Sequence, residues 1–383
     1  MNGAEAKLRF IHSSDWQLGM TRAFLTPEAA SRFSQSRIAA IQKLGELARQ
    51  HDAAFIVVAG DVFESNQVTR QTLLRAVEAL DALPVPVFLL PGNHDPLDGS
   101  SIFSTRELRE AGDHVLVIRT PEPMAVPGLA GAEVVGAPWR SKRPGSDLCA
   151  DMLFGLAPAE GILRVAVAHG QVDKLAPDTS RPDIIDLARA EAAVRERRIH
   201  YLALGDRHSL TDVGSTKRIW YSGTPVVTAF DETEPNKALL VELDAAGACR
   251  VDPLQVGDWK FLALEARLDG PDDLQRIDSM LSELPGKART AVKIGFKGTV
   301  NLATAGRLDE LMEARAELFA SLRRRERTTD LAIVPDGLDE DSVSLAGYAR
   351  SAWDELLASA KGGDEAARDA LRLFYRLSHQ GES

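Results

Sequence analysis

Five apolar runs of strand length each end in residue types that can bind a metal ion or a phosphate. The run at residues 85–90 leads into Pro91-Gly92-Asn93-His94-Asp95, a turn in which a carboxamide, an imidazole and a carboxylate follow one another. The other runs lie at 8–11, 55–59, 163–168 and 201–204, and they lead into Asp15, Asp61, His169, and Asp206 with His208. Because α/β folds place their sites at the carboxyl ends of strands, the pattern predicts one site assembled from five loops.

Segments with helical spacing separate these runs. Apolar residues recur every three or four positions over residues 36–50 and again over 73–80. Later elements are expected as short strands over 115–137, a helical stretch at 184–198, and strands at 219–221 and 238–243. The chain therefore begins β-α-β-α-β, which predicts an α/β layered domain with a mixed sheet over residues 1–256.

Beyond residue 256 the metal-ligand residue types stop, and a small α/β cap domain is expected over 257–337. Its predicted elements are strands at 261–268 and 290–296, a helix at 272–284 and a long charged helix at 305–325. Residues 338–383 are expected to form a C-terminal helical tail. The tail contains an apolar helix face formed by Ala367, Ala370, Leu371, Phe374 and Leu377. Such a face can pack on the cap or dock a partner, and the sequence is compatible with both.

Composition excludes several classes of protein. The net charge of −11 argues against a protein that coats nucleic acid nonspecifically, because that mode needs a broad basic face. The densest basic cluster, at residues 323–327, is interpreted as a solvated helix face. With only Cys149 and Cys249, no disulfide scaffold is expected, and the cytoplasm is the expected compartment. No signal peptide and no apolar run of membrane-spanning length are recognised, so no membrane partner is expected.

The five loops carry the donors of a two-metal centre. Two divalent ions about 4 Å apart can clamp a phosphate ester and activate a water, and one carboxylate must bridge them. Asp61, at the end of a buried strand, is the candidate bridge. The other candidate ligands are Asp15, Asn93, His169, Asp206 and His208. Oxygen donors mixed with imidazoles favour Mn²⁺, with Mg²⁺ or another divalent ion as alternatives.

Each candidate also has a purely structural interpretation. Taken singly, Asp15 can cap a loop or helix, and His169 can be a buried core histidine. Asp206 can be an ion-pair partner of Arg207. The metal interpretation therefore depends on whether the loops converge.

These motifs resemble those of a known superfamily. The segments His12-Ser13-Ser14-Asp15, Gly60-Asp61-Val62-Phe63, Gly92-Asn93-His94-Asp95, His169-Gly170 and Gly205-Asp206-Arg207-His208, in this order, are similar to the motif series of the calcineurin-like metallophosphoesterases. More narrowly, the chain resembles the SbcD-type DNA repair exonucleases. Three further features carry that narrower likeness: Leu18-Gly19, Asn66, and Tyr221-Ser222-Gly223-Thr224-Pro225.

The resemblance implies a fold and a ligand set. The implied fold is a four-layer αββα sandwich with a two-metal centre at its edge. One ion would take Asp15, Gln17, Asp61 and His208, and the other would take Asp61, Asn93, His169 and Asp206. His94 would contact the scissile phosphate or assist the leaving oxygen, with Asp95 as its orienting partner.

Two positions depart from the family pattern. Gln17 stands where the family has a histidine, and Asp206 stands where it has the first histidine of a Gly-His-x-His motif. A glutamine amide oxygen binds a metal more weakly than an imidazole, whereas an aspartate binds hard cations well. Loss of the first ion would leave a catalytically impaired protein.

The expected function is that of a metal-dependent DNA exonuclease or endonuclease in break repair. It would hydrolyse phosphodiesters with a metal-activated water in line with the departing sugar oxygen. The resemblance implies DNA ends or single strands as substrate and an SbcC-like ABC ATPase as partner, and a homodimer is compatible with the sequence. Two alternatives stay open: a phosphodiesterase or phosphatase acting on a nucleotide or phosphoprotein, and an impaired scaffold that binds DNA ends.

Overall fold

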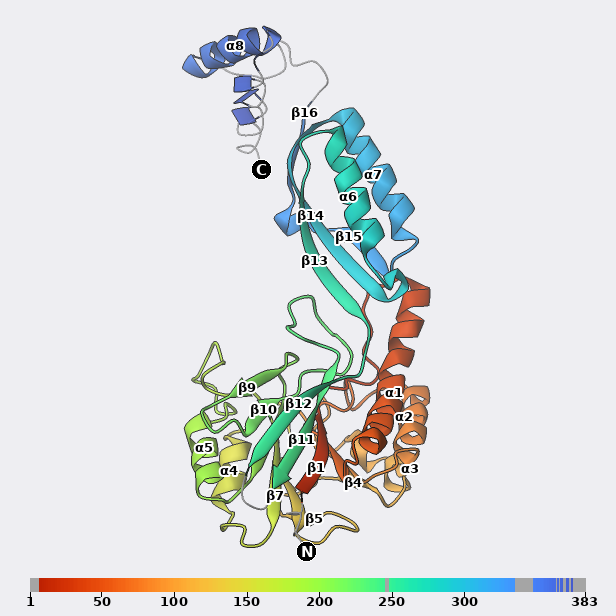
Figure 1. Cartoon of the computed structure of the whole chain (residues 1–383), viewed down its shortest axis with the longest axis vertical. Coiled ribbons are helices and arrows are strands. Elements are labelled where there is room, and N and C mark those ends of the chain that lie inside the picture. Colours follow the sequence, from red (N-terminus) through yellow and green to blue (C-terminus); the bar gives the residue numbers. More distant parts are fainter. Residues whose placement is uncertain are drawn as a thin grey trace, which may run out of the picture. The chain divides into compact units, whose positions relative to one another are not determined.

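The computed structural model describes residues 7–244, 248–334 and 347–362, and then 364, 366, 367, 370, 371, 373 and 374. The chain forms two compact units (Figure 1). The first comprises residues 1–23 and 30–259, and the second comprises 24–29 and 260–383. No helix among the described residues has the length and apolar character needed to span a membrane.

Two six-stranded sheets form the centre of the first unit. One sheet has the order β12-β11-β1-β2-β3-β4, with strands Cys249–Gln255, Lys237–Asp244, Lys7–Ser13, Phe55–Val58, Val87–Leu89 and Val115–Val117. The other has the order β5-β6-β7-β8-β10-β9, with strands Met124–Ala125, Ala132–Gly136, Leu163–His169, Tyr201–Gly205, Ile219–Tyr221 and Thr211–Val213. Strands β1 to β4 are parallel, as are β6, β7, β8 and β10, while the remaining strands pair antiparallel at the edges, so both sheets are mixed.

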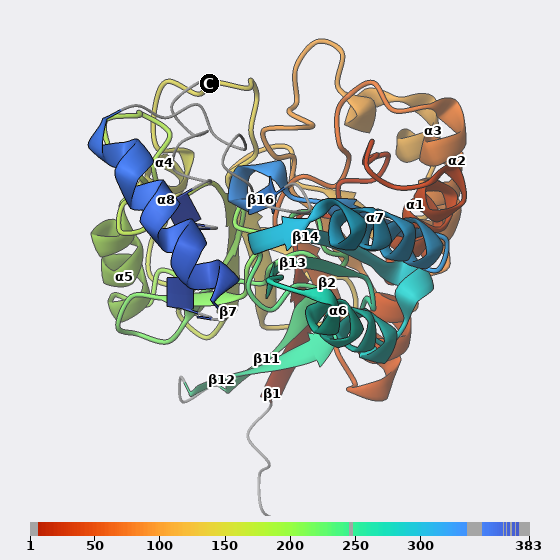
Figure 2. The same ribbon diagram turned by 90° about the horizontal axis from the view of Figure 1, so that it is seen from above.

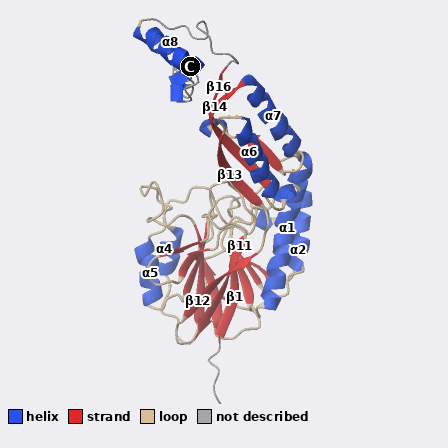
Figure 3. Ribbon diagram, turned by 45° about the horizontal axis from the view of Figure 1, so that its top comes forward, coloured by secondary structure: helices blue, strands red, loops and turns tan. Residues whose placement is uncertain are grey.

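The alternation of side chains along the strands produces four layers. On β1, Phe10 lies in the core between the two sheets, where it stacks on Phe55 with ring centroids 4.9 Å apart, and Ile11 points the opposite way into the core under the helices. The helices over the first sheet are α1 (Pro27–Gln50), α2 (Arg70–Asp81) and α3 (Arg106–Arg109), and those over the second are α4 (Leu148–Phe154) and α5 (Leu187–Arg195). Figure 3 shows the strands between these two sets of helices. The predicted αββα sandwich is confirmed.

Helix α1 begins nine positions before the segment predicted at 36–50. Its start carries a capping arrangement, because Thr26 Oγ1 accepts a hydrogen bond from Ala29 N at 3.2 Å and Pro27 occupies the first helical position. Phe33 in this added stretch is fully buried. Tertiary packing and the cap extend the helix beyond its periodic segment.

The second unit contains a parallel sheet with helices on one face. Its strands are β13 (Lys260–Arg267), β14 (Thr290–Asn301), β15 (Ser321–Arg324) and β16 (Asp330–Val334), and its helices are α6 (Pro271–Glu283) and α7 (Leu302–Ala316). Figure 2 shows α6 and α7 side by side, and both bury apolar residues against the sheet. The small α/β architecture agrees with the fold class predicted for this region.

The expectation of one long helix at 305–325 is wrong. Helix α7 ends at Ala316, and the chain then enters β15, which pairs with β14. Burial of Phe319 and Ala320 and the hydrogen bond from Ala320 N to Thr290 O at 3.1 Å favour the strand. The basic cluster at 323–327 therefore lies on a strand and a following 3-10 turn (Glu326–Thr328), and not on a helix face.

The tail contains helix α8 (Tyr348–Lys361). Trp353, Leu357 and Ala360 of this helix form a cluster with Ala367 and Leu371, and Phe374 packs against it with its ring 5.9 Å from that of Trp353. Part of the predicted apolar face is thus covered from within the tail itself. Leu377, the last member of that face, lies outside the described residues.

Candidate metal centre

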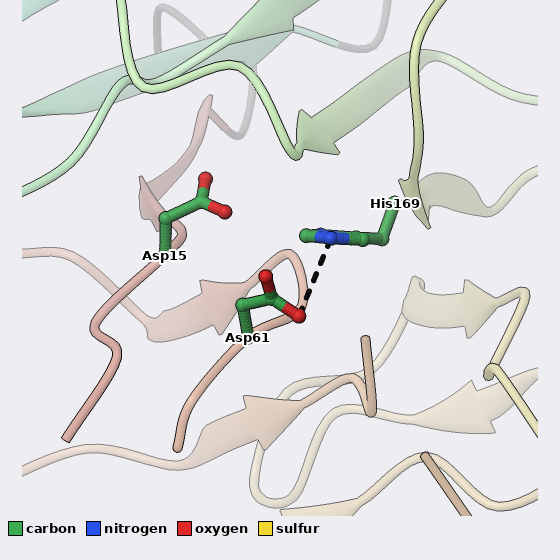
Figure 4. A group of neighbouring side chains, drawn as sticks. All are labelled: Asp15, Asp61 and His169. Atoms are coloured by element: carbon green, nitrogen blue, oxygen red, sulfur yellow. Dashed lines mark ion pairs between the residues drawn. The ribbon is translucent and has the colours of Figure 1, made fainter. Parts of the chain in front are cut away.

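The carboxyl ends of strands from both sheets converge on one site. Asp15 follows β1, Asp61 follows β2, and His169 is the last residue of β7. All three side chains are buried, and one ligand atom from each lies within 4.8 Å of the others. Figure 4 shows them pointing toward a common space from three separate loops. Three segments far apart in the sequence therefore meet as the strand-end pattern predicts.

His169 presents one ring nitrogen to a cluster of oxygen atoms. Its Nδ1 lies 2.8 Å from the carbonyl oxygen of Ala59, so Nδ1 carries the proton and donates it. Its Nε2 lies 2.7 Å from Asn93 Oδ1, 3.4 Å from Asp61 Oδ1 and 3.8 Å from Asp206 Oδ1. The group Asp61, Asn93, His169 and Asp206 could therefore hold one cation.

A second group of candidate ligands consists of Asp15, Gln17 and His208. His208 Nε2 is 3.7 Å from Asp15 Oδ1 and 3.3 Å from Gln17 Nε2. Gln17 is buried, and among the described residues its Oε1 has no hydrogen-bond partner. An orphaned carboxamide oxygen beside an imidazole and a carboxylate fits a divalent cation, because the ion supplies the partner that the oxygen lacks.

Several carboxylates are buried close together at the site, where their negative charges are unfavourable without a cation nearby. Burial raises the pKa of Asp15 to about 6, although His208 and His169 oppose that rise, and burial also raises the pKa of Asp206. Burial acts in the same direction on Asp61, but the neighbouring His169 and His94 outweigh it and hold the pKa of Asp61 below its usual range. A divalent ion would offset the repulsion among these groups.

Glycines leave the space that the site residues occupy. A Cβ on Gly60, where φ is +89°, would lie 2.1 Å from His169 Nδ1. A Cβ on Gly92 would lie 2.2 Å from Asp61 Oδ1. Any side chain at either position would displace a candidate ligand, which is the physical reason for glycine in these two motifs.

Four candidate ligands have left-handed backbone conformations. Asp15, Gln17, Asp61 and Asp206 have φ values of 53°, 43°, 51° and 91°. Such conformations cost about 1–2 kcal/mol per residue outside glycine, somewhat less for aspartate. Backbone hydrogen bonds between the first two loops hold them in place, from Asp15 N to Gly60 O at 3.1 Å and from Gln17 N to Asp61 O at 2.9 Å. The surrounding fold therefore compensates the backbone strain of these residues at the site.

His94 lies above Asp61, but Asp95 does not orient it. The His94 side chain is 38% exposed, its Nε2 is 3.9 Å from Asp61 Oδ2, and its Nδ1 is 3.0 Å from the carbonyl oxygen of Glu64. The carboxylate of Asp95 instead accepts the backbone N–H groups of Phe63 and Gly92, both at 2.8 Å. The expected pairing of Asp95 with His94 is therefore wrong. The backbone carbonyl of Glu64 orients the imidazole, and the Asp95 carboxylate holds the loops of Phe63 and Gly92 together.

The structural alternative for Asp206 is also not what the structure shows. The Arg207 guanidinium donates through Nε to Thr211 Oγ1 at 2.9 Å, and Asp206 instead lies near His169. Asp206 N donates to both carboxylate oxygens of Asp15 at 3.2 Å, which joins the last motif to the first.

The Tyr221 to Pro225 stretch forms hydrogen bonds with the segments that carry Asp15 and His169. The Tyr221 hydroxyl donates to Gly170 O at 2.8 Å and accepts from Val172 N at 2.9 Å, next to His169. Thr224 Oγ1 donates to the carbonyl oxygen of Asp15 at 3.1 Å. This stretch therefore positions two of the site loops.

Two residues that the sequence does not single out also orient the candidate ligands. Trp139 Nε1 donates to the carbonyl oxygen of His169 at 2.8 Å. The Glu232 carboxylate lies 3.2 Å from His208 Nδ1 and accepts the Thr228 hydroxyl, whose oxygen is 2.6 Å from the same nitrogen, so that Nε2 is left for the site. Burial acts to lower the pKa of His208, but the hydrogen bond to Glu232 and the charge of Asp15 outweigh it and raise that pKa. Trp139 comes shortly after β6, but tryptophan is not a metal-ligand residue type, and Glu232 lies well beyond the end of β10, so strand-end reasoning could not find either residue.

Replacing Glu232 by glutamine should weaken metal binding. The Glu232 carboxylate accepts hydrogen bonds from the backbone N–H groups of Thr228 and Ala229 and from His208. A glutamine would place its NH₂ group against one of these N–H donors, so that hydrogen bond would be lost. We expect Mn²⁺ affinity to fall about 10- to 100-fold in isothermal titration, the usual cost of losing a group that orients a metal ligand. Glu234→Gln, at an exposed position on the same loop, is the control. Unchanged affinity in E232Q would restrict Glu232 to bracing the loop.

Comparison with known proteins agrees with this geometry. The model of the calcineurin-like phosphoesterase family matches residues 8–210, which include all five loops. The chain belongs to this family. Members of this family are phosphoesterases that bind a dimetal centre, and the buried Asp15, Asp61 and His169 are compatible with such a centre.

The relatives narrow the likeness further. The chain is 26% identical over 272 residues to the SbcD subunit of nuclease SbcCD from Escherichia coli strain K12, a match that covers 60% of this chain and 63% of that protein. It is 28% identical over 152 residues to the DNA double-strand break repair protein Mre11 of Archaeoglobus fulgidus, covering 35% of this chain and 33% of that protein. Each match thus spans less than two thirds of the relative's own length. The predicted resemblance is confirmed.

Proposed function

We propose that this protein is a metal-dependent DNA nuclease that hydrolyses phosphodiesters at the centre formed by the five loops. The observation that carries the proposal is the position of His94: a partly exposed imidazole stands 3.9 Å from Asp61, a buried carboxylate grouped with Asp15 and His169. His94 is therefore accessible to a phosphodiester that reaches the centre from solvent. The likeness to two nuclease and DNA-repair proteins supports DNA as the substrate.

The chain's own residues would divide the work. Asp15, Gln17 and His208 would hold one ion, Asn93, His169 and Asp206 would hold the other, and Asp61 would contact both. Two divalent ions, most suitably Mn²⁺, supply Lewis-acid chemistry and an activated water when bound. His94 Nδ1 donates its proton to Glu64 O, so Nε2 is the atom that faces the substrate. A protonated Nε2 can hydrogen-bond a phosphate oxygen or donate to the departing sugar oxygen.

Replacing His94 by glutamine should slow DNA hydrolysis without preventing metal binding. Loss of a general acid or of a transition-state hydrogen bond costs about 10²- to 10⁴-fold in rate. The assay uses purified protein with Mn²⁺ against end-labelled duplex DNA, a cyclic dinucleotide and a chromogenic phosphodiester. His51→Gln, in the turn after α1, is the matched control. An unchanged rate in H94Q would remove His94 from the mechanism.

The same three substrates separate the competing functions. Hydrolysis of the cyclic dinucleotide with intact duplex DNA would favour a nucleotide phosphodiesterase. Binding of DNA ends without hydrolysis of any substrate would favour the scaffold alternative, which draws its support from Gln17 and Asp206. Cleavage of the duplex is the result that our proposal requires.

We also propose an SbcC-like ABC ATPase as partner, with the tail at 338–383 as its docking segment. The name of the Escherichia coli relative describes it as one subunit of a larger nuclease, which supports an assembly. Undiminished ATPase association after deletion of the tail would contradict this docking proposal.

A further inference from the structure

A cavity of about 470 Å³ adjoins the candidate metal centre. Its lining includes Asp206, Arg207 and His208 from the last motif, together with Gln171, Tyr221 and Glu232. The volume lies within the range of small-ligand sites in proteins. Because Asp206 and His208 belong to both the cavity and the centre, a substrate held at the centre extends directly into this space.

Most acidic groups of the cavity are already engaged. The Glu232 carboxylate accepts hydrogen bonds from Thr228 N and Ala229 N and pairs with His208. Asp206 lies within 3.8 Å of His169 Nε2. Asp231 is exposed to solvent. Among the described residues, none of these three acids forms an ion pair with an arginine or a lysine.

Arg207 is the arginine that lines the cavity. Its Nε donates to Thr211 Oγ1 at 2.9 Å, which anchors the guanidinium at one edge. Within the described part of the chain, Arg207 forms no ion pair, although acidic residues outnumber basic ones by 56 to 45 in this sequence. Its terminal N–H groups remain available for a ligand. A second arginine, Arg181, forms an ion pair with Asp183, and its charge acts to lower the pKa of Asp206.

We propose that Arg207 forms a second phosphate-binding position, which takes the phosphate next to the scissile one on the same DNA strand. This inference rests on the proposed nuclease function and names the part of the substrate that the site recognises. A guanidinium presents a planar fork of N–H donors that matches two phosphate oxygens. Arg207 lines the same cavity as Asp206 and His208, so a phosphate bound there is a neighbour of the centre.

A consequence for substrate choice follows. A strand with several phosphates engages both the centre and Arg207, whereas a diester with a single phosphate engages the centre alone. The protein should therefore discriminate in favour of oligonucleotides through binding, and that preference should depend on the charge of the neighbouring linkage.

The test is a double-mutant cycle between protein and substrate. Wild-type protein and Arg207→Gln are compared on a thymidine trinucleotide and on the same trinucleotide with an uncharged methylphosphonate at one linkage or the other. Rates with Mn²⁺ and binding by fluorescence polarisation are both measured. We expect the uncharged linkage to cost wild type about tenfold or more in kcat/KM and in Kd, and to cost R207Q about threefold at most, because the charged contact is already lost.

Controls distinguish this contact from general effects. Arg49→Gln makes the same charge change at an exposed position at the end of α1 and should respond to the uncharged linkage as wild type does. R207Q should lose much less activity on the chromogenic diester, which has no neighbouring phosphate, than on the trinucleotide. Arg207→Lys keeps the charge but not the fork and should fall between the two.

The outcomes separate the inference from the function on which it rests. If wild type cleaves the trinucleotide and R207Q suffers the same loss as wild type from the uncharged linkage, Arg207 does not bind that phosphate. If wild type hydrolyses the diester but neither binds nor cleaves the trinucleotide, the nuclease proposal fails, and the inference fails with it. If no substrate is turned over, equal binding losses in the two proteins still overturn the inference.

Discussion

Gly205→Ala should destabilise the first unit more than any other substitution considered for this protein. Gly205 ends β8 and pairs with His169 of β7. A Cβ there would lie 1.8 Å from the carbonyl oxygen of Ala59 and 2.8 Å from His169 Nδ1. The obstacle is backbone that follows a central strand, so it cannot rotate away. We expect a loss of about 4 kcal/mol or more, and a fall in Tm of about 10 °C or more in a calorimetric scan.

The matched control is Gly155→Ala in the same unit. Gly155 has φ of −75°, which alanine adopts readily, and its Cβ would meet only Met152 O at an ordinary 3.6 Å. Its stability should change by about 0.5 kcal/mol at most. Equal Tm values for the two variants would show that the backbone around Gly205 and Ala59 can move to accommodate the methyl group.

Asp61→Asn should abolish both metal-induced stabilisation and hydrolysis. An asparagine has the same shape and can still accept the His94 backbone N–H, now at 3.0 Å from Asp61 Oδ1, so the loop should keep its conformation. It removes the negative charge that we propose contacts both ions. We expect the hydrolysis rate to fall about 10³-fold or more, because the lost transition-state stabilisation amounts to several kcal/mol. The rise in Tm on adding Mn²⁺ should disappear.

Asp52→Asn provides a close control for that variant. Asp52 is exposed, and its φ of 53° matches the 51° of Asp61, so the change in charge and the demand on the backbone are the same. It should leave metal binding and hydrolysis unaltered. If D61N kept a Mn²⁺-dependent Tm shift and its activity, Asp61 would not be a shared ligand.

Much of the fold was predictable because buried strands are apolar and long helices are periodic. Strand β7 (Leu163–His169) lies within or next to its predicted segment, and so do β8 and β10. Strand β12 was not predicted because it is an edge strand in which only Leu254 is buried and which contains Pro253. Helix α4 escaped because seven residues are too few to show a period, and its start depends on the Asp147 cap.

At the site, the sequence predicted which residues come together more reliably than it predicted their hydrogen-bond partners. Asp15 and Asp61 converge because β1 and β2 are neighbouring parallel strands that end at the same edge, a rule that needs no side-chain detail. His169 ends a strand of the second sheet, and it reaches them because the two sheets pack face to face. Asp95 was misassigned because neighbours in a turn point in different directions, and its carboxylate reaches backbone N–H groups instead. Glu232 was beyond reach because only the tertiary path of its loop brings it to His208.

The backbone bonds that tie the Asp15 loop to the Asp61 loop have a consequence for ion exchange. Because Gly60 O and Asp61 O already accept N–H groups from the first loop, the donors are preorganised by folding and owe little of their placement to a bound cation. A chelator should thus remove the ions without unfolding the site, in contrast to small zinc modules that unfold without metal. Which ion returns would then depend on cellular supply and on donor chemistry.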